Sequence, residues 1–333
     1  MHPLPLHSNR VVIISMSDSP APKKASRSPT TRIYLLPPET LTARPSTSGL
    51  ELDGEMSTPW LRRPIKCLSG VDLPISESLA SLSVADCPNT LLNTYGLTCD
   101  NVVNFEVVLL NATIVNANRT CHPDLWWALR GGGNLFGIVT RSTFQAHPLE
   151  DSGKGWGGIR VYTADKRQAI FEALATFIRD YPDAKAAVIP TFDSGLPGAL
   201  ISNPMLFFFY DGSTPSEGAC AGLEAIEALL DGTKTTTYTD LANQAGGAKI
   251  YGIKAAARVN TFPNLNPHNM SSLLEAHWST YQFIIKNDAS RNIDIQIGTF
   301  RLQPLSVRIA RVSQERGGNA LGLNPDHGDR FFG

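Results

Sequence analysis

The feature that most limits how this chain can fold is a series of short apolar segments separated by turns between residues 101 and 147. Residues 101–110 are mostly Val, Phe and Leu, which indicates a largely buried strand. The pair Asn111-Ala112 supplies turn chemistry, and residues 113–117 are β-branched enough to form a returning strand. The pattern predicts a β-hairpin.

A short helix and a third strand are predicted directly after this hairpin. The segment 122–130 has Pro123 and Asp124 at its start, apolar residues at helical spacing, and Arg130 just before a glycine run that ends the helix. After the glycines, residues 136–144 are apolar and β-branched, which predicts a strand that ends near His147-Pro148.

The glycine run, Gly131-Gly132-Gly133, allows two interpretations. A dinucleotide-binding glycine loop follows a strand and precedes a helix, so that the amides at the helix N-terminus meet the phosphates. Here the predicted helix comes first and the strand second. A tight helix-to-strand turn is therefore favoured, and phosphate binding remains the alternative.

Two motifs in residues 94–147 resemble a known family. They read Tyr95-Gly96-Leu97-x-x-Asp100-Asn101-Val102 and Asp124-Leu125-Trp126-Trp127-Ala128-Leu129-Arg130-Gly131-Gly132-Gly133-Asn134-x-Phe136-Gly137-Ile138-Val139-Thr140. This segment of about 54 residues resembles the second half of the PCMH-type FAD-binding domain. That domain belongs to FAD-linked oxidases of the vanillyl-alcohol-oxidase type, and the similarity is greatest to fungal members related to berberine bridge enzyme.

The resemblance implies FAD as the cofactor and a set of backbone contacts to it. In the family, peptide groups at the positions of Gly137-Ile138-Val139 approach the adenosine end of FAD, which is plausible because glycine permits close approach and strand-edge amides can read an adenine. The side chains of Ile138 and Val139, like those of Trp126 and Trp127, are expected in the core. The implied cofactor-binding residues are Tyr95, Gly96, Gly137, Ile138 and Val139.

Family members carry a Gly-Gly-His motif and a glycine-rich phosphate loop before the Tyr-Gly-Leu motif, and residues 1–93 contain neither. Back-translation of residues 69–87, read one frame over, permits Gly-Gly-Arg-Leu-Ala-Asp-Ile-Gly-Val-x-Gly-Leu-Thr-Leu-Gly-Gly-Gly-Leu-Ser, which matches the loop and the strand before it. The first two bases of most codons are fixed by the amino acid, so chance does not readily give such a match. We hypothesise that residues about 46–90 are an out-of-frame translation.

The N-terminal segment, residues 1–85, is predicted to be largely disordered or non-native. Residues 1–50 are rich in Pro, Ser and Thr and show no sustained hydrophobic period. The run Val11-Val12-Ile13-Ile14 is too short to span a membrane and lacks a cleavage context, so no signal peptide is predicted. Family members are often secreted, and the localisation of this chain stays open.

Composition limits the partners. The 333 residues have a net charge of −1, which gives no electrostatic reason to expect nucleic acid or an anionic membrane. The five cysteines show no metal-binding spacing, so no metal site is predicted. Cys99 and Cys121 flank the hairpin; a disulfide between them and two free thiols remain alternatives.

Residues 151–333 are predicted to form a second domain of longer strands and helices. Helices are expected over 165–181, 216–230 and 270–285, and strands over 159–163, 186–192, 205–210, 294–302 and 307–312. This order resembles the family's substrate domain, an antiparallel sheet with flanking helices. The predicted class is α+β, with a disordered or non-native segment over 1–85, a partial FAD-binding domain over 86–150 and a partial substrate domain over 151–333.

Several polar residues of the second domain could face a polar ligand or lie at the surface or an edge: Tyr251, Arg258, His277, Tyr281, Gln296 and Arg301. His277 is expected to be a hydrogen-bonded core histidine. Compared with the family, the chain is expected to be truncated at both ends, and its last aromatic residues suggest an interrupted strand with an exposed edge. No catalytic residue is assigned.

Two functions from different classes follow. The first is a FAD-dependent oxidase that removes hydride from an alcohol, sugar or secondary metabolite, with O₂ as the acceptor. The second is a non-catalytic, truncated product that cannot hold FAD, because the phosphate-binding amides are missing as written. A nicotinamide dehydrogenase is disfavoured by the reversed order of strand and glycines.

Overall fold

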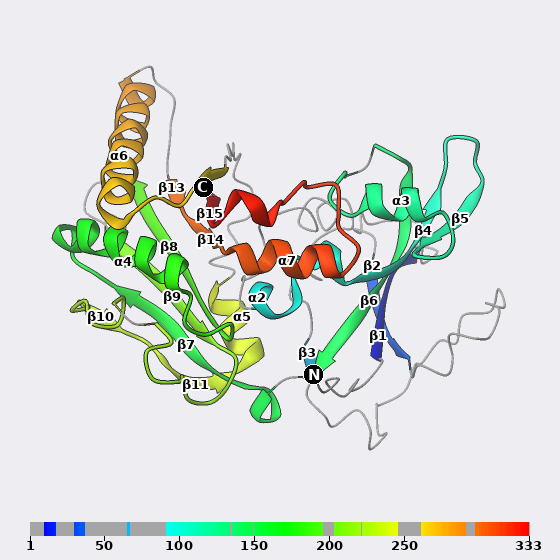
Figure 1. Cartoon of the computed structure of the whole chain (residues 1–333), viewed down its shortest axis with the longest axis horizontal. Coiled ribbons are helices and arrows are strands. Elements are labelled where there is room, and N and C mark those ends of the chain that lie inside the picture. Colours follow the sequence, from blue (N-terminus) through cyan, green and yellow to red (C-terminus); the bar gives the residue numbers. More distant parts are fainter. Residues whose placement is uncertain are drawn as a thin grey trace, which may run out of the picture. The chain divides into compact units, whose positions relative to one another are not determined.

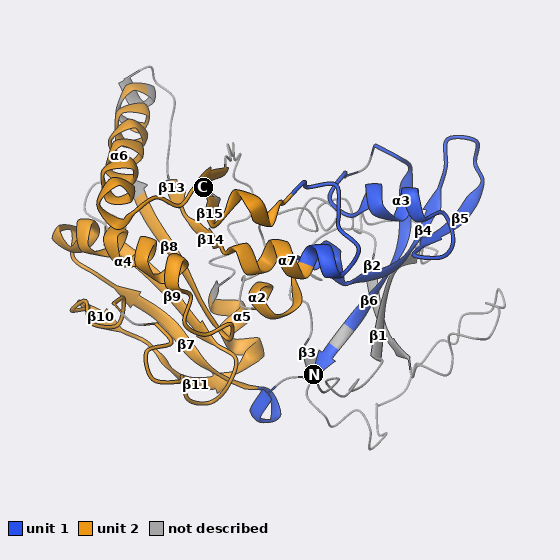
Figure 2. Cartoon of the chain, viewed as in Figure 1, with its two compact units in different colours: residues 1–87, 97–153, 313–322 blue, residues 88–96, 154–312, 323–333 orange. Residues whose placement is uncertain are grey.

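The computed structural model describes residues 10–17, 30–36, 65–66, 91–133, 135–148, 150–195, 203–220, 222–245, 261–290 and 297–332. The chain divides into two compact units, and each unit is built from several stretches of sequence (Figures 1 and 2). Unit 1 contains residues 1–87, 97–153 and 313–322, and unit 2 contains residues 88–96, 154–312 and 323–333. Both combine helices with antiparallel sheets, which confirms the predicted α+β class.

Unit 1 is built on an antiparallel sheet in the order β2-β1-β6-β4-β5, with β3 also paired to β6. Its elements are β1 (Arg10–Ser17), β2 (Thr30–Leu36), β3 (Ile65–Lys66), the 3₁₀ turn η3 (Thr98–Asn101), β4 (Val102–Val108), β5 (Ile114–Asn118), α3 (Pro123–Leu129), β6 (Ile138–Pro148) and η4 (Glu150–Gly153).

The hairpin, helix and strand predicted for residues 101–147 are therefore confirmed as β4–β5, α3 and β6. Phe105, Val107, Ala117 and Val139 alternate inward along their strands and are buried together with Trp126 and Leu129 of α3. This packing follows from the period of two along each strand and the apolar side of the short helix.

Three strands lie in the N-terminal segment for which the sequence predicts little order. β1 pairs with β6 over Arg10–Ser15, β2 pairs with β1, and the short β3 pairs with the end of β6. The apolar run at residues 11–14 is thus the centre of a strand. Most of residues 46–90, where the frame hypothesis applies, lie outside the described residues, and the prediction stays a prediction there.

Unit 2 contains a second antiparallel sheet, in the order β10-β7-β9-β8-β13 with β11 also on β7, and a small sheet β12-β15-β14. The strands of the larger sheet are β7 (Lys154–Val161), β8 (Ala186–Gly195), β9 (Pro204–Tyr210), β10 (Leu230–Asp231), β11 (Lys234–Thr237) and β13 (Ile297–Arg301). Those of the small sheet are β12 (Thr261–Pro263), β14 (Gln303–Leu305) and β15 (Arg330–Phe332).

Helices α4 (Arg167–Asp180) and α6 (Pro267–Ser290) pack on the larger sheet (Figure 1). The core joins the apolar side of α4 to Val188 and Phe192 of β8 and to Phe208 of β9, and Met270 and Leu274 of α6 extend it. The remaining helices are α2 (Leu92–Tyr95), η5 (Ala164–Lys166), α5 (Tyr238–Ala245), α7 (Val307–Glu315) and η7 (Pro325–His327).

Three sequence predictions for this unit are wrong. The helix predicted over 216–230 is mainly a series of turns, because Gly218 and Gly222 take positive φ angles of 76° and 84°. The strand predicted over 307–312 is helix α7, whose first amide donates to Asp329 Oδ1 at 2.7 Å. The terminal strand β15 lies between β12 and β14 and buries Phe331, so it is not an exposed edge.

Candidate functional site

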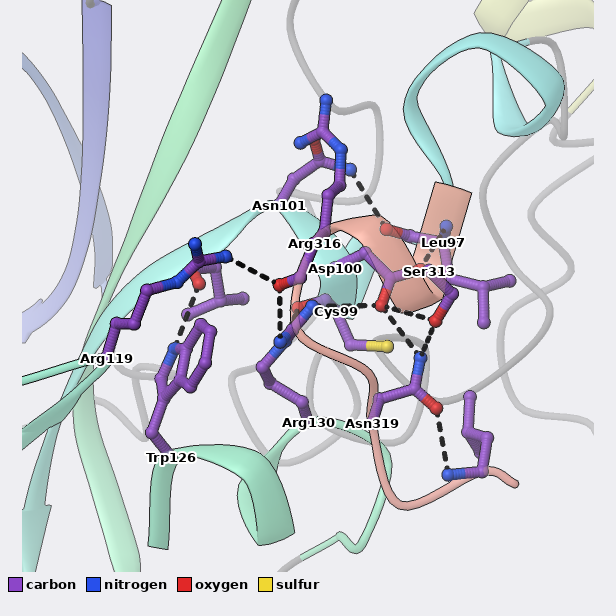
Figure 3. A network of polar contacts seen from close by, with 12 residues as sticks. Leu97, Cys99, Asp100, Asn101, Arg119, Trp126, Arg130, Ser313, Arg316 and Asn319 are labelled. Carbon is purple, nitrogen blue, oxygen red and sulfur yellow. Dashed lines mark hydrogen bonds and ion pairs between the residues drawn. The ribbon is translucent and has the colours of Figure 1, made fainter. Parts of the chain in front are cut away.

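Polar residues from separate stretches of unit 1 meet at the carboxylate of Asp100 (Figure 3). Its Oδ1 accepts hydrogen bonds from Arg130 Nη2 at 3.0 Å, Ser313 Oγ at 3.0 Å and Asn319 Nδ2 at 2.7 Å. Its Oδ2 accepts from the Leu97 amide at 2.9 Å. Four donors satisfy this buried carboxylate, so its role is to hold segments of unit 1 together.

The partner of Asp100, Arg130, is fully buried in the same network. Neither side chain of this ion pair has any exposed surface. The guanidinium also donates to the carbonyl of Cys99 at 2.9 Å and to that of Arg316 at 3.1 Å, and it lies 4.3 Å from the centre of the Trp126 ring. Burial lowers the pKa of Arg130, and the Asp100 carboxylate counteracts the shift.

The hydrogen-bond network on Asp100 also includes Asn319, which lies far along the chain. Asn319 donates to both Asp100 and Ser313, and the amide of Ala320 donates to the carbonyl of Arg130 at 2.8 Å. The run Gly317-Gly318-Asn319-Ala320 thus closes the network with the two motifs of residues 94–147. The sequence contains this run, but no pattern links it to Asp100, because 219 residues separate the two side chains.

The glycine triplet after Arg130 is a helix-to-strand turn, as the order of elements predicts. Gly131 has a φ of +101°, and a Cβ there would lie 2.5 Å from Leu321 Cγ. A Cβ on Gly132 would lie 2.2 Å from the carbonyl oxygen of Ala128. Packing within unit 1 therefore requires both glycines, and no helix follows that could present its N-terminus to a phosphate.

The strand that begins after this turn has an edge that is only partly covered. β4 pairs with β6 from Ile138 onward, whereas β1, on the other side, pairs with β6 only between Arg141 and Ala146. Among the described strands, none pairs with residues 138–140 on the β1 side. Peptide groups on that side can therefore bind a flat ligand such as an adenine by its hydrogen-bonding edge.

Gly137, at the start of this edge, is required by its own neighbours. It has a φ of +148°, and a Cβ would lie 2.7 Å from Val107 Cγ1 and 2.8 Å from the carbonyl oxygen of Val108. The backbone at Gly137 thus lies close to strand β4. The glycine sets the position at which β6 begins.

Several apolar side chains near residues 138–140 of β6 are exposed. Val139 is 2% exposed, as expected of sheet core, but the same expectation for Ile138 is wrong because 68% of its surface is exposed. Ile138 lies opposite Val108, which in turn lies opposite the exposed Ile114, so all three share one face of the sheet. Phe136 is also exposed. An apolar surface beside unpaired peptide groups fits an aromatic heterocycle.

The first two predicted cofactor residues, Tyr95 and Gly96, belong to unit 2, whereas Gly137, Ile138 and Val139 belong to unit 1. Tyr95 ends α2, and Gly96 follows with a φ of +73°. Within unit 2, Asn93 of this helix donates to the hydroxyl of Tyr181 and accepts from Ser306, while its carbonyl accepts from Arg308 Nε at 3.1 Å. Cofactor binding by these five residues stays a prediction.

Other candidates are distributed as follows. Trp126 is buried, as predicted, and donates to the Val102 carbonyl at 3.1 Å, but Trp127 is 46% exposed. His277 is exposed and not in the core; it bonds the Leu273 carbonyl at 2.8 Å and stacks on Phe262. Tyr281 lies beside Trp278 and Phe300, and Arg301 is exposed. Tyr251, Arg258 and Gln296 lie outside the described residues.

Thiols and metal ligands do not form a site in the described residues. Cys99 and Cys121 are free, so the disulfide alternative is not realised, and Cys99 is buried whereas Cys121 is exposed. Burial, together with the neighbouring Asp100 carboxylate, raises the pKa of the Cys99 thiol, which makes it a poor nucleophile. The described part of the chain contains no group of three or more His, Cys, Asp or Glu that can hold a metal ion. None of the described helices is long and apolar enough to cross a bilayer.

Comparison with known proteins supports the resemblance. The chain is 32% identical over 246 residues to an uncharacterized FAD-linked oxidoreductase of Arthroderma benhamiae. This match covers 71% of the chain and 45% of the relative, so the chain spans about half the relative's length. No protein-family model matches the sequence.

Two solved structures share the fold. One is the VAO-type flavoprotein MtVAO615 of Myceliophthora thermophila C1, with 20% identity, a TM-score of 0.50, and coverage of 76% of this chain and 46% of that one. The other is a xylooligosaccharide oxidase of the same organism in complex with xylobiose, with 17% identity, a TM-score of 0.51, and coverage of 75% and 55%.

The chain is thus similar in sequence to a FAD-linked oxidoreductase and shares the fold of a VAO-type flavoprotein. The predicted family resemblance is confirmed.

Proposed function

We propose that this chain carries the adenosine-binding edge and the substrate domain of a FAD-dependent oxidoreductase. The observation that carries the proposal is the edge of β6 at residues 138–140, with which no other described strand pairs on the β1 side, flanked by the exposed Phe136 and Ile138. Proteins similar to the chain are FAD-linked. The network on Asp100 supports the proposal because it holds Arg130, and hence the turn that leads into β6, in place.

Residues 136–140 fit the adenosine part of FAD. Peptide groups of residues 138–140 would bind the adenine edge, and Ile138 and Phe136 would contact the ring. When bound, FAD accepts hydride from the substrate and is reoxidised by O₂. The chain's own groups bind and orient the cofactor. The substrate we propose is a small molecule with a CH–OH centre, as in an alcohol, a sugar or a secondary metabolite; the similar xylooligosaccharide oxidase was solved with a sugar.

A second candidate is a non-catalytic product that does not hold FAD. The observation that favours it is the role of the glycine triplet, which packs as a helix-to-strand turn in unit 1 and offers no helix N-terminus to the two phosphates. In the frame as written, no phosphate-binding glycine loop precedes Tyr95. Without amide donors, two phosphate charges beside the sheet would be poorly compensated.

One experiment separates the two candidates. The full chain is purified with excess FAD, and its visible absorption and flavin fluorescence are measured after gel filtration, beside a matched chain in which residues 46–90 are replaced by the alternative-frame translation. Stoichiometric flavin on the chain as written supports the first candidate. We expect the written chain to bind FAD weakly and the restored chain to be yellow. A colourless restored chain would contradict the proposal.

A further inference from the structure

The chain contains three Asn-x-Ser/Thr triplets, the sequence that attachment of an N-linked oligosaccharide requires. They begin at Asn111, Asn118 and Asn269, and all three lie in the part of the chain that the structure describes. A transferase must reach both the amide nitrogen of the asparagine and the hydroxyl two residues later. The placement of these two groups distinguishes the three triplets.

The first triplet, Asn111-Ala112-Thr113, forms the turn between β4 and β5, at the free end of the hairpin (Figure 1). All three residues are exposed. Asn111 Oδ1 accepts hydrogen bonds from the Thr113 amide at 3.1 Å and from the Thr113 hydroxyl. These bonds bring the hydroxyl to the asparagine side chain through its oxygen. Among the described residues, no group accepts a hydrogen bond from Asn111 Nδ2, so a sugar there would break no contact.

The second triplet lies in the same hairpin, but the nitrogen of its asparagine is already hydrogen-bonded. Asn118 Nδ2 donates to Asn104 Oδ1 at 3.0 Å, across the β4–β5 pair, and the residue is half-buried. Its Oδ1 accepts from the amides of Thr120 and Cys121 at 3.0 and 2.8 Å. A sugar on this nitrogen would separate Asn118 from Asn104, so the folded hairpin disfavours modification at Asn118.

The third triplet is made inaccessible by helix α6. Asn269 is exposed, but Met270 and Ser271, in the first turn of the helix, are only 0% and 3% exposed. The Ser271 hydroxyl cannot reach a transferase unless α6 unwinds and Met270 leaves the core. Asn111 therefore begins the one triplet of the three in which the fold leaves both groups available.

The surroundings of Asn111 also suit a large hydrophilic group. Leu110 and Ile114, on either side of the triplet, are exposed apolar residues, and β5 is an end strand of its sheet. An exposed edge with apolar side chains can pair with the edge of another chain. An oligosaccharide on the turn would hinder such pairing.

We propose that Asn111 is an N-glycosylation site. Its Nδ2 attacks the anomeric carbon of a lipid-pyrophosphate-linked oligosaccharide: a C–N bond forms, the C–O bond to the pyrophosphate breaks, the amide loses one proton, and the lipid pyrophosphate leaves. This transfer takes place in the lumen of the endoplasmic reticulum and concerns chains that enter the secretory pathway. It is independent of FAD binding.

The first test uses the full chain behind a cleavable secretion signal in a eukaryotic secretory host. The secreted protein is digested with and without peptide N-glycosidase, and mass spectrometry of the peptides gives the occupancy of each asparagine. We expect a glycan on Asn111 in most molecules and a much lower occupancy at Asn118 and Asn269. An unoccupied Asn111, or an equal occupancy at Asn118, would overturn the proposal.

Two threonine substitutions form a matched pair, because each removes an exposed hydroxyl that donates to the asparagine of its own triplet. Thr113→Ala should abolish the glycan, and Thr113→Ser should retain it because the hydroxyl remains. Thr120→Ala should leave the glycan in place. If the glycan is lost in Thr120→Ala and kept in Thr113→Ala, the modified residue is Asn118 and the assignment to Asn111 is wrong. Circular dichroism confirms that each variant is folded.

The second test measures whether the fold selects the site. Unglycosylated full chain from a bacterial host is incubated with UDP-glucose and a soluble N-glycosyltransferase that glucosylates the same triplet. Asn111 should be modified in the folded chain, whereas Asn118 should be modified only in a synthetic peptide of residues 115–123. Modification of Asn118 in the folded chain as fast as in the peptide would contradict selection by the hairpin.

Discussion

Arg130 shows most directly what a single side chain contributes to this protein. It is buried, paired with Asp100 and hydrogen-bonded to two carbonyls. Arg130→Met should lower the free energy of unfolding by about 3–5 kcal/mol, because it leaves a buried carboxylate without its counterion. Urea unfolding followed by circular dichroism measures this change.

The matched control is Arg179→Met. Arg179 pairs with Asp180 at 2.8 Å, but both side chains are about half exposed and screened by water, so its removal should leave the free energy of unfolding nearly unchanged. A loss below about 1 kcal/mol for Arg130→Met would contradict the role assigned to the network.

The raised pKa of Asp193 predicts that the stability of the protein depends on pH. Its pKa in the folded protein lies above the ordinary value of 3.8, so its protonated form is favoured by folding. The stability that this preference supplies is present below pH 3.8 and is lost as the pH rises through the folded-state pKa. The unmodified chain should therefore match Asp193→Asn in acid and fall below it towards neutral pH.

Thermal unfolding of both chains between acid and neutral pH tests this dependence. Asp165→Asn serves as the control, because the pKa of Asp165 is lowered by its hydrogen bond to Thr163 and its difference from the unmodified chain should have the opposite sign. A gap between Asp193→Asn and the unmodified chain that stays constant with pH would rule out the predicted protonation.

At the scale of single elements, the start of β6 depends on one glycine. Gly137→Ala should cost about 2–4 kcal/mol, because the new Cβ meets both Val107 and Val108 and the backbone angle is strained. Gly133→Ala is the control: its φ is +69°, but nothing lies within 4 Å of the new Cβ, so about 1 kcal/mol is expected. Equal losses in chemical denaturation would show that the contact with β4 does not position β6.

The elements that the sequence predicts are those with local signals. The hairpin β4–β5, helix α3, strand β6 and helix α4 follow from period, turn and cap residues within each segment. Helix α7 does not, because its β-branched residues favour a strand and the group that caps its first amide, Asp329, lies 22 residues away.

Some features of the candidate site could be predicted from local sequence, and others depend on contacts with distant residues. The strand that contains Gly137 and Val139 is readable from composition, whereas the exposure of Ile138 depends on what covers its face. Asp193 sits in an ordinary alternating run, Thr191-Phe192-Asp193, and no local signal marks it. Its special environment arises from pairing with Thr299, more than a hundred residues later.

At the scale of the whole chain, each unit is assembled from separate stretches of sequence, whereas the predicted domains 86–150 and 151–333 are continuous. Residues 88–96 belong with unit 2, and residues 313–322 belong with unit 1. The division even falls within α7, between Val312 and Ser313. Sequence order alone could not show this exchange, because it is specified by long-range polar contacts such as that of Asn319 with Asp100.

The frame hypothesis also belongs to the whole chain. Sequencing the transcript through the codons of residues 88–93 should show an inserted or missing base relative to the frame that encodes the glycine-rich loop. A transcript that matches the written frame would mean that this polypeptide is made without that loop, and the non-catalytic candidate would then be favoured.

The convergence of residues 97–101, Arg130 and residues 313–322 on one carboxylate has a consequence for recombination between related genes. A crossover placed anywhere between residues 147 and 313 would inherit Asp100 and Arg130 from one parent and Asn319 from the other. Such chimeras can keep the hydrogen bonds to Asp100 only if both parents carry the same amide donor. Laboratory shuffling of these genes should therefore exchange the two stretches as one block.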